Sequence, residues 1–494
     1  MVTISPALRA RAAPRRMTLD VGFIRRTFFI LGLLLLLISP FAPDPLAFAV
    51  GGFVPWVVLS IAGLPFIPVA AIFYFVWQWC QVFAQALLSI IDGQSMSTAS
   101  FGGGVMSAYW YSLASLVVLA CAFRLVFSGM RGPSPVEEVA HLEWRPLDLF
   151  FLYCGTLVLA VACTYATRLI PGLSQQFEAV SRLKIVAEFL LFVTVLGTGR
   201  GNKFLLAAVV VEIVIGFSGL LSDFRGVFVY LAMAAIAARI VLSVTSIVGG
   251  VVWFSLLLAL GLFWTAVKAE YREYATEGEE TQHFSIPIED RLAYLGNLAL
   301  ASGSIDWGDA AYAMLNRFAY IDIFGSVITY QDATKEGAPM RQWQEALGHV
   351  FKPRFFFPDK ADLSDTATYA RLAGIDPALV LRGTTSISVG YMGENYVDLG
   401  FPGMLAGIFV LGLMLASSLR YFMRVRFLPW MVKQGIALAF VYNVAGVGLE
   451  ASLPKLFGSI IMFFLVYLLL AKFVLPIGLQ WLHARASTEP AQAS

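Results

Sequence analysis

Charge is scarce in this chain, and so are the residues that form disulfides and metal sites. Only 13% of the 494 residues are charged and 59% are hydrophobic, whereas about 25% of the residues of a soluble domain are charged. The net charge of +2 argues against nucleic acid as a partner. The four histidines have no spacing that suits a metal ion, so no metal site is expected. The four cysteines lie unpaired inside apolar runs, as small buried residues do: Cys80, Cys121, Cys154 and Cys163.

Motifs for nucleotides and for hydrolysis are missing too. The chain has no Asp-x-Asp pair, no Gly-x-x-x-x-Gly-Lys-Ser/Thr loop and no Gly-x-Ser-x-Gly turn. These absences argue against a nucleotide-driven pump and against a cytoplasmic nucleotide-sugar transferase. No cofactor is expected.

Long apolar stretches make up most of the sequence, and a stretch of about 20 residues can cross the hydrocarbon core. We therefore expect an all-α, multi-span membrane protein with about 12 transmembrane helices. Prolines at positions 40, 43 and 45 interrupt the first two stretches. The predicted spans are residues 27–43, 48–64, 68–92, 107–128, 146–168, 184–199, 203–221, 225–243, 248–268, 398–419, 432–450 and 456–478.

Basic residues at the ends of these stretches predict the orientation of the chain. Six arginines precede residue 27 and are expected to be cytoplasmic, ahead of an uncleaved first span. Twelve crossings then place both termini in the cytoplasm. The predicted parts are a basic N-terminus (1–26), a nine-helix membrane region (27–268), a large outer loop (269–397), a three-helix membrane region (398–478) and a cytoplasmic tail (479–494). Four basic residues fall outside against the rule: Arg168, Arg182, Lys184 and Arg225.

The large outer loop is where the charge gathers. From Glu270 to Tyr396 it holds 18 of the 32 acidic residues and 10 of the 34 basic ones. Residues 291–332 have the amphipathic pattern of short helices that lie flat on a membrane, and residues 333–397 contain many Gly and Pro breakers. We interpret this loop as the functional part and the spans as its platform.

One segment of the loop reads Lys352-Pro-Arg354-Phe-Phe-Phe-Pro-Asp-Lys360. The planar fork of arginine suits phosphate oxygens, and lysine adds a mobile charge. The segment could bind a lipid-linked pyrophosphate, or it could be an interfacial loop that holds anionic headgroups. His349 lies close by and is a possible site residue.

A second segment runs from Arg382 to Gly403 and enters the tenth predicted span. Its hydroxyl groups, including those of Ser386 and Ser388, could bond sugar or phosphate. Glu394 could act as a general base on a sugar hydroxyl, or it could pair with an arginine for structure.

Few ionisable residues lie inside the predicted spans, among them Glu188, Glu212, Lys268 and Glu450. Glu212 is near the middle of the seventh span, where an unpaired charge costs several kcal/mol, so it needs a partner, a water or a proton. A functional role and a neutral interhelical hydrogen bond both remain open for it. Arg225, at the outer mouth of the eighth span, could face an anionic substrate or pair with Asp223.

The order of these parts resembles the Wzy-type O-antigen and exopolysaccharide polymerases of bacterial inner membranes, within the O-antigen polymerase/ligase superfamily. The resemblance covers the last half of the chain, and in this sequence Lys352 and Ala361 depart from the usual pattern. The residues that carry it are Pro353–Lys360, Thr385–Gly390, Gly393–Tyr396 with Gly400 and Gly403, and Phe217–Arg225.

The resemblance implies a metal-independent glycosyltransferase with a GT-C-like membrane fold and a periplasmic loop. Its substrate would be an undecaprenyl-pyrophosphate-linked oligosaccharide repeat unit, and a chain-length regulator would be a further candidate partner. The alternatives are an O-antigen ligase with the same donor and a lipid-oligosaccharide flippase. The implied roles are pyrophosphate binding by Arg225, Arg354, Lys360 and Arg382, substrate contacts by Lys352, Ser386, Ser388, Tyr391 and Tyr396, and orientation or deprotonation of the acceptor hydroxyl by Glu394.

Overall fold

The chain is helical throughout the part that the computed structural model describes. That part comprises residues 17–63, 66–98, 103–218, 224–277, 286–301, 303, 305–334, 339–352, 357, 360, 363–376, 387–445 and 448–487. Within it, extended pairing is limited to one antiparallel bridge between Thr18 and Val241. The helices in the first half are α2 (Val21–Ile38), α3 (Pro45–Ala62), α4 (Val69–Asp92), α5 (Gly103–Phe127), α6 (Pro135–Val139), α7 (Pro146–Leu169), α8 (Ser174–Ser181), α9 (Leu183–Thr198), α10 (Asn202–Ser218) and α11 (Arg225–Ala237).

The second half continues the same pattern. Its helices are α12 (Val244–Ala275), α13 (Ile288–Leu300), α14 (Trp307–Phe318), α15 (Ile321–Thr334), α16 (Arg341–Val350), α17 (Asp365–Ala373), α19 (Gly390–Arg424), α20 (Trp430–Ala445), α21 (Leu453–Leu469) and α22 (Leu475–Ser487). A 3-10 turn, η5 (Gly448–Glu450), joins α20 to α21, and a π-helical segment, η6 (Leu470–Val474), joins α21 to α22.

A helix lies on each of the twelve predicted spans. By length and hydropathy, eight continuous helical stretches in the described residues are long and apolar enough to cross a membrane. They are Val21–Phe41, Pro45–Ala62, Val69–Asp92, Gly103–Phe127, Pro146–Leu169, Val244–Ala275, Gly390–Arg424 and Leu453–Arg485. The other four, α9, α10, α11 and α20, have 16, 17, 13 and 16 residues. The described part of the chain is therefore all-helical, with eight candidate membrane-crossing helices.

Helix α12 shows most clearly why the sequence indicates a membrane protein. The Ser243 hydroxyl caps its first turn by accepting the Ser246 N–H. Val251 and Phe254 are 60% and 59% exposed. No residue in the most apolar stretch of α12 is buried within the chain. A helix that is apolar all round and still exposed needs an apolar surrounding. Lipid supplies it.

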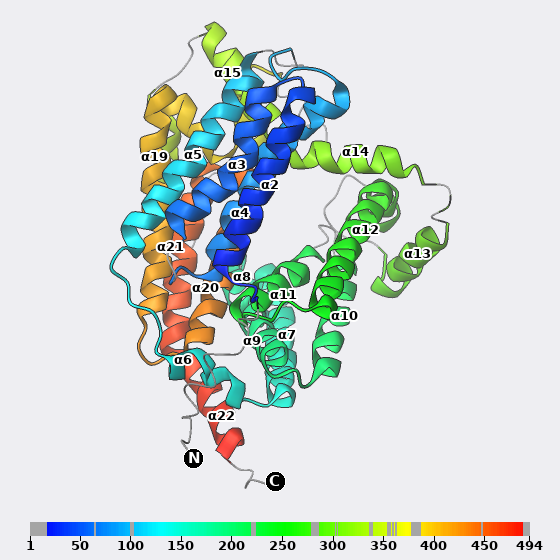
Figure 1. Cartoon of the computed structure of the whole chain (residues 1–494), viewed down its shortest axis with the longest axis vertical. Helices are drawn as coiled ribbons and strands as arrows, with labels where there is room; N and C mark the ends of the chain where they lie inside the picture. The colour runs from blue at the N-terminus through cyan, green and yellow to red at the C-terminus, as the bar shows by residue number, and fades with distance from the viewer. Residues whose placement is uncertain are drawn as a thin grey trace, which may run out of the picture.

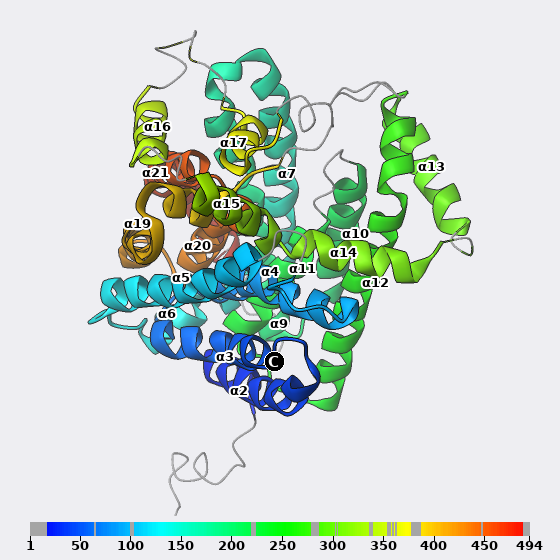
Figure 2. The ribbon, with the colours of Figure 1, turned by 90° about the horizontal axis from the view of Figure 1, so that it is seen from above.

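The long helices form a large packed group with a smaller one beside it (Figure 1). Helices α2 to α5 pack with α19, α20 and α21, and α7 packs with α9 and α10 at the side. Helix α14 runs crosswise to the long helices in Figure 1 and contacts both α12 and α4, which Figure 2 shows from above. This crosswise course agrees with the amphipathic pattern of residues 291–332.

Helix α19 begins at Gly390, earlier than the predicted start of the span at residue 398. Gly390 and Gly393 look like helix breakers in the sequence, but they serve close packing. A Cβ on Gly390 would lie 2.0 Å from the carbonyl oxygen of Leu449, and one on Gly393 would lie 2.5 Å from a Val389 methyl group. The helix changes direction at Gly400 and Phe401, where the backbone is not helical.

Candidate functional site

A cavity of about 110 Å³ lies beside the crosswise helix α14, at the N-terminal end of α11. We call it the cation cavity. Helices α4, α11, α12 and α14 and the η5 turn supply its walls. Its lining is Trp77, Gln81, Phe224, Arg225, Gly261, Trp264, Thr265, Lys268, Met314, Arg317, Phe318 and Glu450.

Three cations from three different helices meet in this cavity. Arg225 is the first residue of α11, Lys268 lies near the end of α12, and Arg317 lies in the last turn of α14. Within the part of the chain that the structure describes, none of the three forms a salt bridge. Arg225 and Arg317 are exposed and Lys268 is half-buried. Like charges repel one another, so their convergence favours an anion in the cavity.

Glu450 supplies the carboxylate of the cavity. Its Oε1 accepts a hydrogen bond from Gln81 Nε2 at 3.3 Å, while Gln81 Oε1 accepts the Leu449 N–H at 2.9 Å. Burial raises the pKa of the Glu450 carboxyl, and the positive charges of Arg317 and Arg225 oppose that rise. The turn needs glycine at 448, because φ is +64° and a Cβ would lie 1.8 Å from Gln81 Oε1.

Aromatic rings close the cavity and leave one donor unused. The guanidinium carbon of Arg225 lies 5.7 Å from the centre of the Trp77 ring, and Phe318 meets the same ring edge-on at 4.9 Å. The buried Trp77 Nε1–H has no hydrogen-bond partner among the described residues. Three cations and a free indole donor suit a ligand that is rich in anionic oxygen, such as a phosphate ester.

The predicted phosphate-binding residues fall in different places. Arg225 lines the cation cavity, whereas Arg354, Arg382 and Ser386 lie outside the described residues. Lys360 lines a separate groove beside α21, where its Nζ donates to the backbone carbonyl of His349 at 2.5 Å. Lys352 is exposed.

The predicted residues at the start of α19 make structural contacts, and none of them lines the cation cavity. The backbone carbonyl of Ser388 accepts the Tyr320 hydroxyl, and the Tyr391 hydroxyl donates to Gln78 Oε1 at 2.6 Å. The Tyr396 hydroxyl donates to Asp332 Oδ1 at 2.8 Å.

Glu394 is buried at the start of α21. Its Oε2 accepts the Leu453 N–H at 2.7 Å, so it holds the first turn of that helix. Asp398, one turn further along α19, accepts the N–H groups of Gln342 and Trp343 at 2.9 and 2.8 Å and holds the first turn of α16. These two carboxylates tie helices together, because the first N–H groups of a helix need an acceptor.

Glu212 does have a partner, as the cost of a buried charge requires. Its Oε2 lies 2.6 Å from Lys184 Nζ, and its Oε1 accepts the Tyr153 hydroxyl at 2.9 Å. The side chains of Glu212 and Lys184 are 8% and 15% exposed. This pair accounts for Lys184, one of the basic residues that broke the charge rule.

Sequence reasoning missed Arg317 and assigned no site role to Lys268 or Glu450. Arg317 comes near the end of a short amphipathic helix, where a basic residue is common. Only the crosswise course of α14 brings it to Arg225. The signal that was available is the pair of intramembrane charges, Lys268 and Glu450, at the predicted outer ends of two spans.

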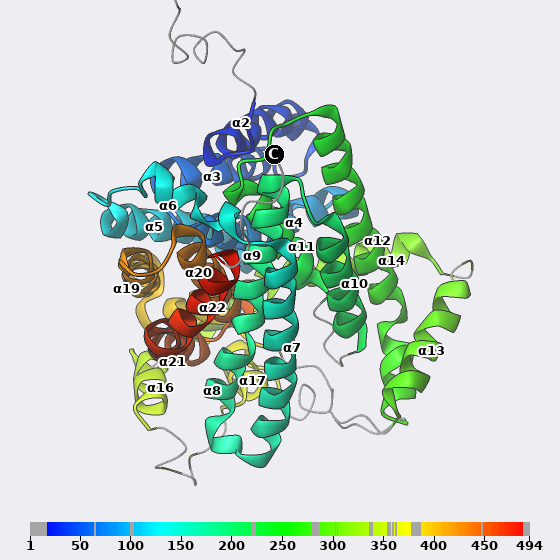
Figure 3. The same cartoon turned by 90° about the horizontal axis from the view of Figure 1, so that it is seen from below.

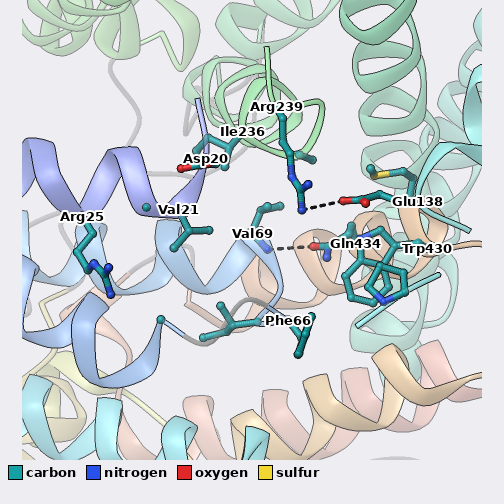
Figure 4. A pocket seen from close by; sticks show the side chains of 16 residues that line it. Asp20, Val21, Arg25, Phe66, Val69, Glu138, Ile236, Arg239, Trp430 and Gln434 are labelled. Carbon is teal, nitrogen blue, oxygen red and sulfur yellow. Dashed lines mark hydrogen bonds and ion pairs between the residues drawn. The ribbon is translucent and has the colours of Figure 1, made fainter. Parts of the chain in front are cut away.

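A second cavity, of about 420 Å³, lies at the C-terminal end of α11 (Figure 4). We call it the paired cavity. Here Arg239 points to Glu138, with 2.8 Å between Arg239 Nη2 and Glu138 Oε1, and Gln434 Oε1 accepts the Val69 N–H at 2.9 Å. The lining holds two acidic and two basic residues, Asp20, Glu138, Arg25 and Arg239, so its charges balance in number.

In the described residues, the long apolar helices define an α-helical membrane protein, and three cations from different helices line one of its cavities. Among the described residues, no group of three or more His, Cys, Asp and Glu side chains could hold a metal ion. No model of a protein family matches the chain, and no curated protein or solved structure matches it either.

Proposed function

We propose that this chain is a metal-independent, lipid-pyrophosphate-dependent glycosyltransferase of the bacterial inner membrane. It would join undecaprenyl-pyrophosphate-linked oligosaccharide repeat units into a surface polysaccharide or exopolysaccharide at the periplasmic face. The observation that carries the proposal is the convergence of Arg225, Lys268 and Arg317 on one cavity that also holds Glu450.

The cations of the cavity would hold the leaving group. The acceptor hydroxyl oxygen attacks the anomeric carbon of the donor sugar, and a new C–O bond forms as the bond from that carbon to the pyrophosphate oxygen breaks. The bonding electron pair leaves with the pyrophosphate, which stays on its lipid. Preorganised cations in a water-poor site stabilise this developing charge, and this leaving group makes a nucleotide unnecessary.

Glu450 is our candidate for the proton acceptor, in place of Glu394. A general base has to reach the hydroxyl that it deprotonates. Glu450 lines the cation cavity, whereas Glu394 is bound to the Leu453 N–H. Burial raises the pKa of the Glu450 carboxyl and so makes it a stronger base than an exposed glutamate.

The proposed topology has twelve crossings, a GT-C-like arrangement, cytoplasmic termini and a periplasmic loop. Its support is the helix on each predicted span and the position of the cavity. Arg225, Lys268 and Glu450 come from the ends of α11, α12 and the α20–α21 connection that the charge rule assigns to the outer side. A reporter active only in the periplasm, fused after Met340, should be active; activity of a cytoplasmic reporter there would contradict this topology.

Deletion of the gene followed by analysis of surface-polysaccharide length tests the function. Loss of a polymerase leaves single repeat units, loss of a ligase leaves full-length polymer on the carrier, and loss of a flippase traps repeat units facing the cytoplasm. The proposal expects the first result and fails on the other two. Complementation with Arg317→Ala should not restore polymer, whereas Arg239→Ala, in the paired cavity, should. A chain-length regulator is a further candidate partner, as in the resemblance to the polymerase family.

A further inference from the structure

One glutamine side chain connects α4 to the turn that carries Glu450. Gln81 Oε1 accepts the Leu449 N–H at 2.9 Å, and Gln81 Nε2 donates to Glu450 Oε1 at 3.3 Å. Gln81 is 2% exposed and lies 368 positions from Leu449 in the sequence. A single buried amide therefore joins the N-terminal helices to the connection between α20 and α21.

The orientation of this amide is fixed by the backbone. A backbone N–H can only donate, so the Leu449 N–H requires the carbonyl end of the Gln81 amide, and the NH2 end then has to face Glu450. Gly448 allows this close approach, because a Cβ there would lie 1.8 Å from Gln81 Oε1 and 2.8 Å from Trp77 Nε1. The amide thus presents a donor, and not an acceptor, to the carboxylate.

Helix α4 supports this amide from several sides. It packs with α3, α5, α11, α14 and α20, and Figure 3 shows it from below beside α5 and α11. One turn before Gln81, on the same face of α4, the Trp77 ring centre lies 5.7 Å from the guanidinium carbon of Arg225. One face of one helix thus contacts the carboxylate of the cation cavity and one of its cations.

One oxygen of Glu450 is available to a ligand. Among the described residues, Gln81 makes the only hydrogen bond to this carboxylate, and it does so at Oε1. Oε2 is therefore the oxygen that can receive a proton from a hydroxyl group in the cavity. Helix α19 also packs against the η5 turn, but its Glu394 accepts the Leu453 N–H. The charged and titratable groups near the carboxylate come from α11, α12, α14 and the α14–α15 connection and are Arg225, Lys268, Arg317 and Tyr320.

We propose that Gln81 is a positioning residue for Glu450, which holds Oε1 and leaves Oε2 to accept the proton of the acceptor hydroxyl. This inference rests on the proposed function, in which Glu450 is the base. The proton passes from the hydroxyl oxygen to Oε2 as that oxygen attacks the anomeric carbon, and the pyrophosphate leaves with the bonding electron pair. Gln81 itself transfers no proton.

The donor from Gln81 also affects when the carboxylate is ionised. A hydrogen bond donated to a carboxylate stabilises its ionised form, so the loss of this donor should raise the pKa of the Glu450 carboxyl. Because the base acts only when it is ionised, the acid limb of the pH profile should then move to higher pH. A residue that merely packs would leave that limb in place.

Three variants of α4 separate positioning from packing. Gln81→Leu removes both the donor and the acceptor. Gln81→Glu keeps an acceptor for the Leu449 N–H, and so protects the turn, but loses the NH2 donor. Gln85→Leu makes the matched change one turn further along α4, where Gln85 is buried, its Oε1 has no partner among the described residues and it does not line the cation cavity.

Initial rates on a lipid-linked repeat unit, normalised to folded protein, give the first measurement. Both Gln81 variants should lower kcat about tenfold or more and change KM by less than about threefold. Both should also move the acid limb of kcat to higher pH, and Gln81→Glu should move it further because two neighbouring carboxyls resist joint ionisation. Gln85→Leu should leave kcat, KM and the limb unchanged.

The ionisation of Glu450 can also be followed without any transfer reaction. Infrared difference titration of the full-length protein, with Glu450→Gln as the reference, isolates the carboxyl band of this residue. The midpoint of the titration should rise in Gln81→Leu and stay in place in Gln85→Leu. If the midpoint moves in this way but the unaltered protein makes no polymer, the proposed function fails and Gln81 still orients the carboxyl group.

Two results would overturn the inference while the proposed function stands. In a protein that makes polymer, one is an unmoved midpoint or an unchanged kcat in both Gln81 variants. The other is an equal loss in Gln81→Leu and Gln85→Leu, which would mean that both glutamines act only through the packing of α4.

Discussion

The two ends of α11 carry cavities that treat charge in opposite ways. At the N-terminal end, Arg225, Lys268 and Arg317 gather around one carboxylate, Glu450, without a salt bridge among the described residues. At the C-terminal end, Arg239 has its own partner in Glu138 at 2.8 Å. One helix thus joins a site with surplus positive charge to a site whose acidic and basic residues are equal in number.

This difference distinguishes charges that stabilise the fold from charges that are available to bind a ligand. Burying a charge without a partner costs several kcal/mol, and matching it removes much of that cost. The buried pair of Lys184 and Glu212 is matched in this way, and the paired cavity has as many acidic as basic residues. The cation cavity has three cations and one carboxylate, and its exposed Arg225 and Arg317 side chains are open to a ligand. The proposed pyrophosphate supplies the balancing negative charge.

The largest expected effect is the loss of a cation from the cation cavity. Arg317→Ala should lower polymer formation per molecule by about 100-fold or more, because it removes a donor that stabilises the leaving group. Arg239→Ala in the paired cavity is the matched control and should stay within a few-fold of the unaltered protein. Turnover on a lipid-linked repeat unit, normalised to protein level, measures both. An equal loss of turnover in the two variants would show that the two cavities do not differ in function.

The second effect concerns the two carboxylates, Glu450 and Glu394. Glu450→Gln keeps the shape and the contact with Gln81 but removes the base, so turnover should fall by about 100-fold to 10,000-fold. Glu394→Leu leaves the buried Leu453 N–H without its acceptor, which costs about 1–3 kcal/mol of stability. Detergent melting temperature and turnover per folded molecule separate the outcomes. A stable, inactive Glu394→Gln protein would return the role of base to Glu394.

A smaller effect should be visible in the pH profile. Glu450 acts as a base only when it is ionised, so activity is present above its pKa and lost as the pH falls through it. Burial raises the pKa of this carboxyl, and Arg317 opposes the rise. Arg317→Gln should therefore move the acid limb of the normalised profile to higher pH, whereas Arg239→Gln should leave it in place. An unmoved limb in Arg317→Gln would mean that another group titrates.

Much of the architecture follows from local sequence, because an apolar stretch of span length has few options besides a helix in lipid. The amphipathic pattern of residues 307–318 likewise agrees with the crosswise course of α14. The start of α19 was harder to predict. Gly390 and Gly393 look like breakers until Leu449 and Val389 are seen against them.

The site was only partly predictable because it forms through tertiary contact. Arg225 was identified by its place at the mouth of a span, and it does line the cavity. Arg317 is 92 residues further along the chain and reaches Arg225 only through α14. The position of Glu394 near cations in the sequence predicts a catalytic role. In the structure, its carboxylate accepts the Leu453 N–H at the start of α21. The proximity of two charged residues along the sequence therefore does not predict which partner each side chain contacts in the fold.

The smallest expected effect lies in the paired cavity, where Arg239 has a left-handed backbone with φ of +47°. That conformation costs a non-glycine residue about 1–2 kcal/mol, and the Arg239 side chain is 58% exposed, so its ion pair contributes only about 0–1 kcal/mol. Arg239→Ala loses the pair and keeps the strain, whereas Arg239→Gly loses the pair and relieves it. Thermal unfolding in detergent should therefore rank Gly above Ala by about 1 kcal/mol, with turnover unchanged in both. The reverse order would mean that the contact with Glu138 contributes more to stability at this end of α11 than the backbone strain costs. The ion pair would then be stronger than the exposure of the Arg239 side chain indicates.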